Sequence, residues 1–376
     1  MRTVRTTLVA VTAVVLSAAL AGPAFAAPRG HGDHKATREA IEAAVQDGVP
    51  GVTIAAGHWS AAAGVGNLRT GAPRSGDDRY RVGSISKTFL STVLLQLEAE
   101  GRLSLDDTVE KWLPGVVRGN GNDGGKVTLR QLLNHTSGIY DYTEDEDFVR
   151  TYFTADGFFK HRYDTRSPRD LVAIAMTHQP EFAPGTTWKY SNTNYIVAGM
   201  VIEKVTGAPY GDEIRRRVIE PLGLHATSVP GTRATLPQPS SRAYSKLART
   251  TTGATYDVTE LNPSLAGAAG EIISDSRDLN RFYAALLKGR LLPPKQLKEM
   301  KTTVPTGGPG QYGLGIANVQ LSCGVRVWGH DGGIHGSDSV ALTTADGRHS
   351  VAFNFNGDWS QETAADAVVE AEFCGE

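Results

Sequence analysis

The sequence is poor in cysteine, in net charge and in long hydrophobic runs. Its 376 residues include two cysteines, which together with ten scattered histidines give no ligand spacing typical of a zinc site. The formal net charge of −2 gives no basis for nucleic-acid binding, which needs a strongly basic surface. No apolar run beyond the N-terminus is long enough to cross a bilayer. We therefore expect a soluble, monomeric globular protein with no metal, no cofactor and no nucleic-acid partner.

The N-terminus has the features of an export signal. Arg2 and Arg5 precede a short apolar run at residues 8–20, and Ala-Phe-Ala at 24–26 fits the small-x-small pattern of a cleavage site. A transmembrane anchor is the alternative, but the run is short and is followed by a glycine and a proline. We expect residues 1–26 to be a signal peptide and the mature protein to be secreted into the extracellular space, free of the membrane.

The chain has two cysteines, Cys323 and Cys374, and expected export from the cell affects how they are interpreted. In an exported protein an even number of cysteines favours a disulfide, because the compartment is oxidising. We expect one bridge between them, and two buried free thiols are the alternative.

Segments that resemble strands lie at both ends of the chain, and helices and loops fill the middle. Alternating apolar residues and turn residues predict two strands within 50–68 and a further set between 312 and 357. The expected fold class is α/β, with an antiparallel sheet built from N- and C-terminal strands, flanked by helices, and an inserted mainly helical subdomain. The predicted boundaries are 27–110 and 264–376 for the α/β domain and 111–263 for the subdomain.

The stretch Gly-Ser-Ile-Ser-Lys at 83–87 opens an apolar helical pattern. Ser84 and Lys87 are three residues apart and share a face of the first turn, whereas Ser86 does not. A serine there lies at the positive end of the helix dipole, and a buried lysine loses its proton more easily than an exposed one. Ser-x-x-Lys is a signature of serine acyl enzymes. On these residues alone, a helix cap with a solvated lysine is the simpler interpretation.

Two later motifs change that interpretation. Tyr190-x-Asn192 follows a turn, and His330-x-Gly332 lies on a predicted strand with Gly333 beside it. With the Ser-x-x-Lys pair, the three motifs in this order resemble the serine penicillin-recognising enzymes of the class C β-lactamase superfamily. The segments RVGSISKTF, LLNHTSGIYDYT, YSNTNYIVAGMVIEKVTG and AGEIISDSRDL resemble in particular the secreted D-alanyl-D-alanine carboxypeptidases. The resemblance runs from about residue 43 to 374 and implies a β-lactamase/transpeptidase-like fold.

The resemblance assigns the catalytic roles. Ser84 is expected to attack the substrate carbonyl and to form an acyl-enzyme, with Lys87 helping to take its proton. Tyr190 is expected to pass a proton to the leaving amine and then to help activate the deacylating water. The positions of Cys323 and Cys374 also fit a disulfide of the carboxypeptidase group.

The resemblance also assigns the groups that hold the substrate. Asn192 is expected to bind the substrate amide, and the N–H groups of Ser84 and Gly333 to form an oxyanion hole. His330 is expected to lie near Tyr190 and to bias its proton, with Gly332 completing the third motif. A small acyl or peptide substrate is implied, and binding of β-lactams is possible.

The sequence departs from the carboxypeptidase pattern where a substrate carboxylate would bind. In close relatives an arginine on the strand after Gly-Leu-Gly is associated with that carboxylate, and here the strand reads Gly-Ile-Ala-Asn-Val at 315–319, with Ala317 and no arginine. The middle residue of the third motif is Asp331, which would repel a carboxylate. The alternative is that Asp331 points away from the site, because successive strand residues face opposite sides of a sheet. A D-Ala-D-Ala carboxypeptidase is still the first prediction. An esterase, a D-aminopeptidase or amidase, or a β-lactamase is the alternative, and a non-catalytic cell-wall-binding relative is a remote one.

Three other residues near these motifs are set aside. His135 is interpreted as holding a loop and Glu271 as a cap, both structural. His335 lies close to the third motif, and either a structural or a functional role fits it.

Overall fold

The computed structural model describes residues 33–248, 252–359 and 362–375. The predicted signal peptide, residues 1–26, lies outside the described residues. Within these ranges, no helix is both long enough and apolar enough to cross a membrane.

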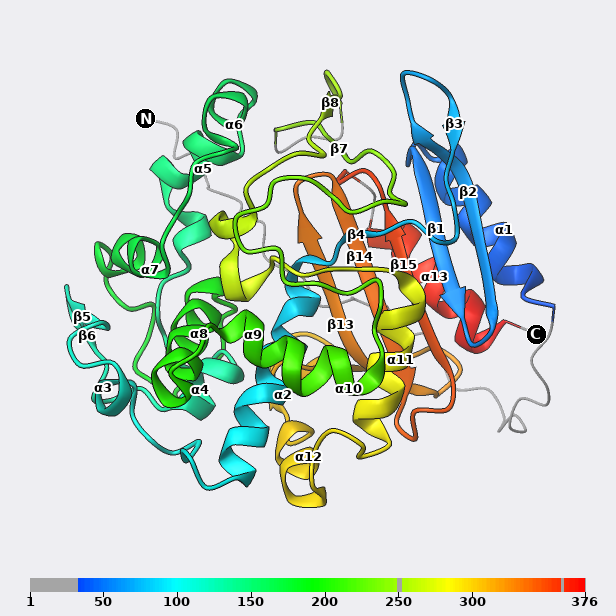
Figure 1. The fold of residues 1–376 in the computed structure, drawn as a ribbon. Coiled ribbons are helices and arrows are strands. Elements are labelled where there is room, and N and C mark those ends of the chain that lie inside the picture. Colours follow the sequence, from blue (N-terminus) through cyan, green and yellow to red (C-terminus); the bar gives the residue numbers. More distant parts are fainter. Residues whose placement is uncertain (1–32, 249–251, 360–361, 376) are drawn as a thin grey trace.

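A nine-stranded antiparallel sheet is the centre of the fold (Figure 1). Its order is β10-β11-β12-β13-β14-β15-β1-β2-β3, so strands from the two ends of the chain meet where β15 pairs with β1. The bounds are β1 Gly51–Ala56, β2 Trp59–Asn67, β3 Ala72–Pro73, β10 Val304–Pro305, β11 Gln311–Tyr312, β12 Ala317–Gln320, β13 Arg326–Ile334, β14 Ser337–Thr344 and β15 Ser350–Phe355. This is the mixed α/β fold, with an antiparallel sheet built from both termini, that the sequence predicts.

Helices cover both faces of the sheet. The first and last helices, α1 (Lys35–Gln46) and α13 (Glu362–Cys374), lie side by side on one face (Figure 1). α11 (Ser276–Leu287) packs on the other face against β14, β15 and β1. Every residue of β1 and of β15 is buried, as expected for central strands that are covered on both sides.

The middle of the chain is mainly helical and lies beside α2 (Ser86–Ala99), at one side of the sheet (Figure 1). Its helices are α3 Val109–Trp112, α4 Leu129–Leu133, α5 Glu146–Tyr152, α6 Ala155–His161, α7 Pro168–Met176, α8 Asn192–Thr206, α9 Tyr210–Ile214 and α10 Glu220–Leu222; α12 (Pro294–Met300) follows later. One apolar core runs through α2, α8 and α11. The predicted boundaries at 110/111 and 263/264 stay a prediction.

Short strand pairs and single turns complete the fold, and of these η1 and η5 pack against α2 at the candidate site. The pairs are β4 (Tyr80–Arg81) with β9 (Ile273–Ser274), β5 (Arg118–Gly119) with β6 (Asn122–Asp123), and β7 (Tyr244–Ser245) with β8 (Tyr256–Asp257). The turns are η1 Gly83–Ile85, η2 Tyr142–Glu144, η4 Pro263–Leu265 and η5 Gly267–Ala269, with a π-helical turn, η3, at Arg215–Ile219. Through these, α2, α8 and β13 converge on one place.

Candidate active site

The serine and lysine of the Ser-x-x-Lys motif are in contact at the start of α2. The chain forms the 3-10 turn Gly83–Ile85 before the α-helix begins at Ser86. Lys87 Nζ lies 2.9 Å from Ser84 Oγ. Ser84 is 7% exposed and Lys87 is fully buried. The structure therefore places the predicted nucleophile within hydrogen-bond reach of the predicted base.

Lys87 has two further partners besides the serine. Its Nζ lies 2.8 Å from Asn192 Oδ1 and 2.8 Å from the carbonyl oxygen of Ala269. Burial lowers the pKa of Lys87 to about 7, and the carboxylates of Asp141 and Asp331 oppose that shift. Near neutral pH a large fraction of Lys87 is thus a neutral amine. That amine keeps two N–H donors for Asn192 and Ala269 and turns its lone pair to the Ser84 hydroxyl, as a general base requires.

Tyr190 precedes α8 and closes the other side of the serine. Its ring centroid is 4.8 Å from Lys87 Nζ, and the residue is 8% exposed. Burial raises the pKa of Tyr190 well above its usual value, while the nearby Ser84 hydroxyl lowers it. No contact of the Tyr190 hydroxyl in the described ranges meets hydrogen-bond geometry, although the atom is buried. A neutral phenol beside the Ser84 hydroxyl, whose own hydroxyl has no partner of good geometry among the described residues, is suited to exchange a proton with a bound substrate.

Asn192 is held by the protein rather than left free for a ligand. Its Nδ2 donates to Asp141 Oδ2 at 2.9 Å and to Thr143 Oγ1 at 3.3 Å, and its Oδ1 accepts from Lys87. Burial raises the pKa of Asp141, and hydrogen bonds from Asn192 and Thr143 oppose this. The predicted contact of Asn192 with substrate stays a prediction. What the structure adds is that Asn192 connects Lys87 to a buried carboxyl group.

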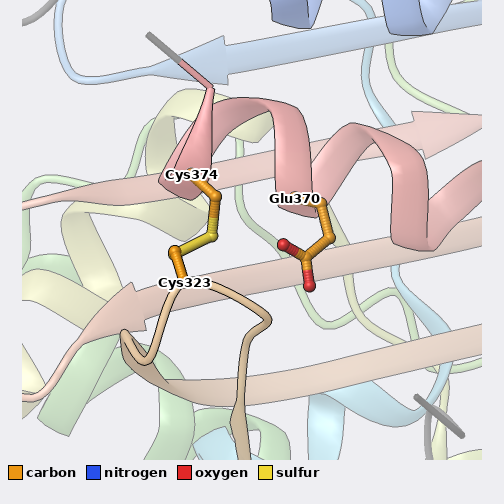
Figure 2. A group of neighbouring side chains, drawn as sticks. All are labelled: Cys323, Glu370 and Cys374. Carbon is orange, nitrogen blue, oxygen red and sulfur yellow. A yellow bond between two sulfur atoms is a disulfide. The ribbon is translucent and has the colours of Figure 1, made fainter. Parts of the chain in front are cut away.

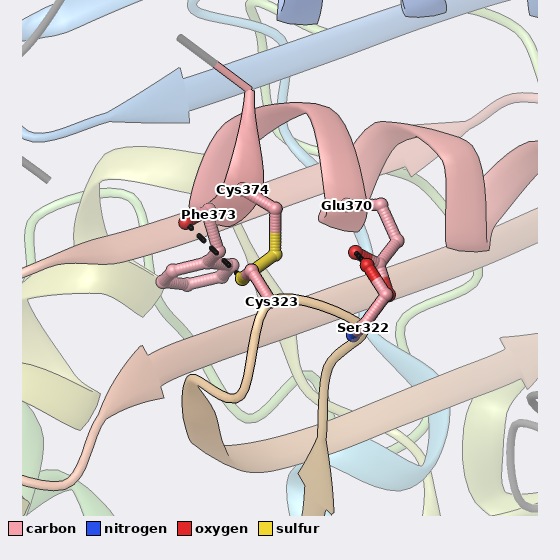
Figure 3. Close-up of a disulfide and its surroundings, with 5 residues drawn as sticks. All are labelled: Ser322, Cys323, Glu370, Phe373 and Cys374. Atoms are coloured by element: carbon pink, nitrogen blue, oxygen red, sulfur yellow. Dashed lines mark hydrogen bonds between the residues drawn. A yellow bond between two sulfur atoms is a disulfide. The ribbon is translucent and has the colours of Figure 1, made fainter. Parts of the chain in front are cut away.

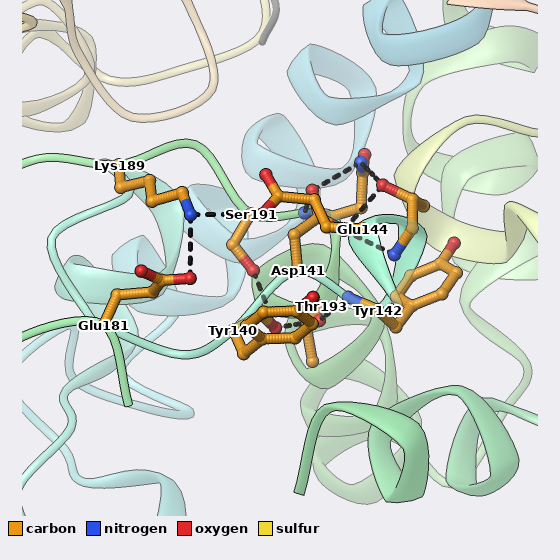
Figure 4. A network of polar contacts seen from close by, with 10 residues as sticks. Tyr140, Asp141, Tyr142, Glu144, Glu181, Lys189, Ser191 and Thr193 are labelled. Atoms are coloured by element: carbon orange, nitrogen blue, oxygen red, sulfur yellow. Dashed lines mark hydrogen bonds and ion pairs between the residues drawn. The ribbon is translucent and has the colours of Figure 1, made fainter. Parts of the chain in front are cut away.

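Figure 4 shows the polar network around Asp141. The Ser191 and Thr193 hydroxyls both donate to the carbonyl oxygen of Tyr140, and the N–H of Tyr142 donates to Thr193 Oγ1. These bonds tie η2 to the start of α8. Asp141 was not a sequence candidate; it lies in the quoted segment LLNHTSGIYDYT, but a single aspartate there carries no spacing signal.

His330 lies next to the predicted catalytic tyrosine but bonds to a different one. His330 Nε2 and Tyr312 Oη are 2.7 Å apart, whereas the rings of His330 and Tyr190 have centroids 6.4 Å apart. Burial lowers the pKa of His330, and Asp331 opposes the shift. Tyr312 was not a sequence candidate, because nothing in the sequence shows that β11 lies beside the site. His330 and Tyr190 are neighbours that no hydrogen bond joins within the part of the chain that the structure describes, and the predicted influence of His330 on the Tyr190 proton stays a prediction.

The turn that carries Ser84 packs directly on β13. Gly83 has φ +52°, and a Cβ atom there would lie 2.8 Å from the backbone N of Gly333. A Cβ at Gly332 would lie 2.7 Å from the backbone N of Ser84 and 2.1 Å from the oxygen of Val82. Glycine is therefore required at 83 and 332 for this close approach. It brings Gly333 beside the serine turn, and the predicted oxyanion hole stays a prediction.

The residues set aside as structural lie at the edges of the site. The ring centroids of His135 and Tyr190 are 4.2 Å apart, and His135 Nδ1 accepts from the N–H of Ser191 at 3.1 Å, so this histidine holds the segment before α8. Glu271 is buried, accepts from the Tyr210 hydroxyl, and has its pKa raised to about 7 by burial. His335 is buried, its Nε2 lies 2.7 Å from the carbonyl oxygen of Tyr152, and its ring stacks with Phe153 and Phe158.

A groove opens from the site toward α13. Its volume is about 180 Å³, and its lining is mostly apolar. Its lining includes Tyr190 and His330 of the candidate site, Ala317 of β12, and Val369 of α13. The side chain of Asp331 lines the groove and is 53% exposed. This carboxylate is available to a ligand that occupies the groove.

The two cysteines form a disulfide that joins α13 to the turn after β12. Cys323 and Cys374 have Cα atoms 5.7 Å apart and are bonded through their sulfur atoms (Figure 3). Glu370 lies beside them (Figure 2) and accepts from both the N–H and the hydroxyl of Ser322. The three side chains have the spacing of a metal site. Because both sulfurs are consumed by the bridge, they offer no thiolate ligands, and the group is interpreted as a structural clamp.

The site contains a buried serine that is hydrogen-bonded to a lysine of lowered pKa, with a tyrosine and an asparagine beside them. This arrangement is typical of serine hydrolases that form an acyl-enzyme. The Beta-lactamase family profile matches residues 36–373, so the chain belongs to this family. It is a serine hydrolase of the β-lactamase and penicillin-binding protein superfamily.

Several individual proteins of this family are similar to the chain. The chain is 60% identical to the D-stereospecific amidohydrolase from Streptomyces sp., with a TM-score of 0.87 over 92% of this chain and 100% of that one. It is 29% identical to the D-amino acid amidase from Ochrobactrum anthropi SV3 in complex with L-phenylalanine amide, with a TM-score of 0.76 over 89% of this chain and 97% of that one. Penicillin-binding protein 4* of Bacillus subtilis (strain 168) is 28% identical over 76% of this chain. The chain spans 62% of the length of that relative, and 53% of the putative penicillin-binding protein PbpX of the same organism.

Proposed function

We propose that this protein is a serine amidohydrolase that hydrolyses amides of D-amino acids with a free α-ammonium group. The observation that carries the proposal is the half-exposed carboxylate of Asp331 in the groove beside the catalytic residues. It would attract a substrate ammonium and repel a substrate carboxylate by about 1–4 kcal/mol at a 4 Å separation. The likeness to a D-stereospecific amidohydrolase over nearly the whole chain also supports the proposed hydrolysis of D-amino acid amides.

The proposed reaction uses the contacts found at the start of α2. Ser84 Oγ bonds to the amide carbonyl carbon while its proton passes to the neutral Lys87 amine, 2.9 Å away. As the carbon–nitrogen bond breaks, the Tyr190 phenol gives its proton to the leaving nitrogen and is reprotonated from the Lys87 ammonium. Ammonia or an amine leaves, and the acyl group stays on Ser84.

Deacylation repeats these transfers with water as the nucleophile. Water attacks the ester carbonyl and gives its proton to the Tyr190 hydroxyl, which passes its own proton to the neutral Lys87 amine. The Ser84 oxygen takes a proton back from Lys87 as it leaves. The products are the free amino acid and the regenerated serine. The sum is amide plus water giving acid plus amine, with no cofactor consumed.

The D-Ala-D-Ala carboxypeptidase predicted first from sequence is the second candidate. The match to penicillin-binding protein 4* favours it, while Ala317 and Asp331 in the groove favour the amidase. Secretion after cleavage at residue 26 is part of the proposal, since an extracellular enzyme would meet free amino acid amides and peptides directly.

A substrate panel separates the candidates. Ammonia release from D- and L-phenylalanine amide is measured beside D-alanine release from an acyl-D-Ala-D-Ala peptide and hydrolysis of a short-chain ester. We expect the D-amide to exceed the L-amide in kcat/KM by on the order of 100-fold, and to exceed the peptide as well. Faster release of D-alanine than of ammonia would overturn the amidase in favour of the carboxypeptidase, and ester turnover alone would overturn both.

A further inference from the structure

His135 follows α4 at a position where helices often end in glycine or asparagine. Asn134 is the C-cap of α4, and His135 comes next with φ +60°. This left-handed conformation favours glycine, because a Cβ atom is crowded in it, and asparagine is among the side chains that tolerate it best. His135 is also fully buried. A buried histidine in this conformation is strained, and residues strained in this way gather at functional sites.

Both chain neighbours of Tyr190 are hydrogen-bonded to His135. The N–H of Lys189 donates to the His135 carbonyl oxygen at 3.1 Å, and the N–H of Ser191 donates to His135 Nδ1 at 3.1 Å. Asn194 Nδ2 lies 3.2 Å from the same Nδ1. Since Nδ1 accepts, the ring hydrogen is on Nε2, which is buried without a partner among the described residues. One histidine thus fixes the backbone on either side of Tyr190.

The ring of His135 also supports the ring of Tyr190. The two centroids are 4.2 Å apart, with 30° between the ring planes. The His135 ring is in turn packed against Tyr195 and Tyr312, at centroid distances of 5.3 and 4.9 Å. All four residues are buried. Because buried rings in a close-packed interior have little room to turn, this packing sets the orientation of the Tyr190 phenol.

His135 takes no part in the proton transfers themselves. Burial lowers the pKa of His135 well below its ordinary value, and Lys87 and His330 lower it further, so the ring is neutral at neutral pH. Within the described ranges its side chain has no hydrogen bond to Ser84, to Lys87 or to the Tyr190 hydroxyl. An effect of His135 on turnover would therefore pass through the placement of Tyr190.

We propose that His135 is a positioning residue for Tyr190, which it holds where the phenol can pass a proton beside Ser84 and Lys87. The role rests on the proposed function only in that Tyr190 transfers a proton there. It is the same whether the substrate is a D-amide, a peptide or an ester. The interpretation from sequence, that His135 holds a loop, is thereby extended: the loop is the one that carries Tyr190.

A double-mutant cycle tests this role. His135→Asn removes the ring but offers an oxygen near the place of Nδ1, and asparagine suits the left-handed backbone, so the variant should fold with a Tm within about 5 °C of wild type. Its kcat should fall by about 10–100-fold with KM nearly unchanged, as expected for a misplaced catalytic group. In a Tyr190→Phe background the same change should lower kcat by less than about twofold, because the hydroxyl that it positions is gone.

Turnover is measured on whichever substrate wild type hydrolyses fastest among D-phenylalanine amide, an acyl-D-Ala-D-Ala peptide and a short-chain ester. His178→Asn is the matched control, since it removes a histidine stacked on another tyrosine, Tyr140, at 3.8 Å, and its kcat should stay at the wild-type level. Wild-type kcat in His135→Asn, or an equal loss with and without the Tyr190 hydroxyl, would overturn the proposal.

A second variant decides if His135→Asn does not fold. His135→Phe keeps a ring beneath Tyr190 but leaves the Ser191 N–H without an acceptor, so its Tm should fall while kcat stays within about tenfold of wild type. A folded His135→Phe as slow as Tyr190→Phe would contradict the role of the ring. A Tyr190→Phe enzyme with wild-type kcat would instead overturn the proposed reaction, and this role with it.

Discussion

The two sides of the candidate active site are built differently. On the side of α2 and α8, Lys87 has three partners from within the chain, and Asn192 is fixed between Lys87 and Asp141. On the side of the groove, Asp331 is half exposed among apolar residues. The first side fixes the chemistry, because its geometry is set by the protein alone. In the proposed function the second side selects the substrate, because the charge of Asp331 is left for a ligand to meet.

The largest expected effect is the loss of the nucleophile. Ser84→Ala should lower kcat for amide hydrolysis by about 10³–10⁶-fold, as for other serine nucleophiles. Ser86→Ala is the matched control: its hydroxyl accepts from the N–H of Ile272 and faces away from the reaction. The control should keep its turnover and lose only a little stability. Comparable losses in both variants would contradict the assignment of Ser84.

Tyr190→Phe should give the next largest loss. Removing the proton-transfer hydroxyl should lower kcat by about 10²–10⁴-fold, the usual contribution of a general acid or base. Because that hydroxyl has no hydrogen-bond partner in the described structure, the Tm should hardly change. Steady-state kinetics and thermal unfolding are measured together. A large fall in Tm would show that Tyr190 is structural.

The pH dependence should report Lys87. Its pKa is lowered to about 7 by burial, and only the neutral amine accepts the serine proton, so kcat/KM should fall about tenfold per pH unit below about pH 7. At higher pH kcat/KM should fall again, because the substrate α-ammonium group loses its proton with a pKa of about 7.7–8.0. Asp141 raises the pKa of Lys87, so Asp141→Asn should move the acidic midpoint to lower pH. The profile is measured with the D-amide as substrate. A midpoint that stays fixed in Asp141→Asn would show that Lys87 is not the titrating group.

The groove side should give a smaller and substrate-dependent effect. Asp331→Asn should lower kcat/KM for a D-amino acid amide by about tenfold, which corresponds to about 1.4 kcal/mol, and should spare an N-acylated amide that has no ammonium group. Asp366→Asn is the control, since it makes the same change elsewhere in the groove. Equal losses with both substrates, or in both variants, would contradict ammonium recognition by Asp331.

The smallest effect on turnover should come from the α13 side of the groove. Replacing Cys323 and Cys374 together by serine opens a link across 51 residues and should lower the free energy of unfolding by about 2–4 kcal/mol. Turnover by the folded protein should be nearly unchanged, because the disulfide holds α13 and not the catalytic residues. Urea unfolding measures the loss of stability, and an activity assay at ambient temperature measures turnover. A large loss of kcat in the folded variant would show that α13 influences the chemistry.

The sequence predicted one side of the site better than the other. Spacing placed Ser84 and Lys87 on one face of a helix, and alternation predicted strands from both ends of the chain in one antiparallel sheet, as found. Those features are local, so periodicity reveals them. Tyr312 and Asp141 were missed, because each enters the site through contacts between elements distant in sequence, which no local pattern records.

The substrate prediction was also limited by contacts that the sequence does not show. The absence of an arginine at Ala317 and the presence of Asp331 were visible in the sequence, but nothing local shows that both line one groove beside His330. Only the fold makes them parts of a single surface. The carboxypeptidase prediction rested on the three motifs and on longer segments that resemble that group. Ala317 lies outside the motifs, and Asp331 occupies the variable middle position of the third.

The central claim, that Ser84 carries the acyl group of a D-amino acid during turnover, has one direct test. Wild-type protein is mixed with a D-phenylalanine ester or amide, quenched in acid within the first turnovers, and measured as intact protein and after peptide digestion by mass spectrometry. The account predicts a mass increase of one phenylalanyl group, located on the peptide that contains Ser84 and absent with the L-enantiomer. An adduct on another residue, or D-amide hydrolysis that persists in Ser84→Ala, would contradict it.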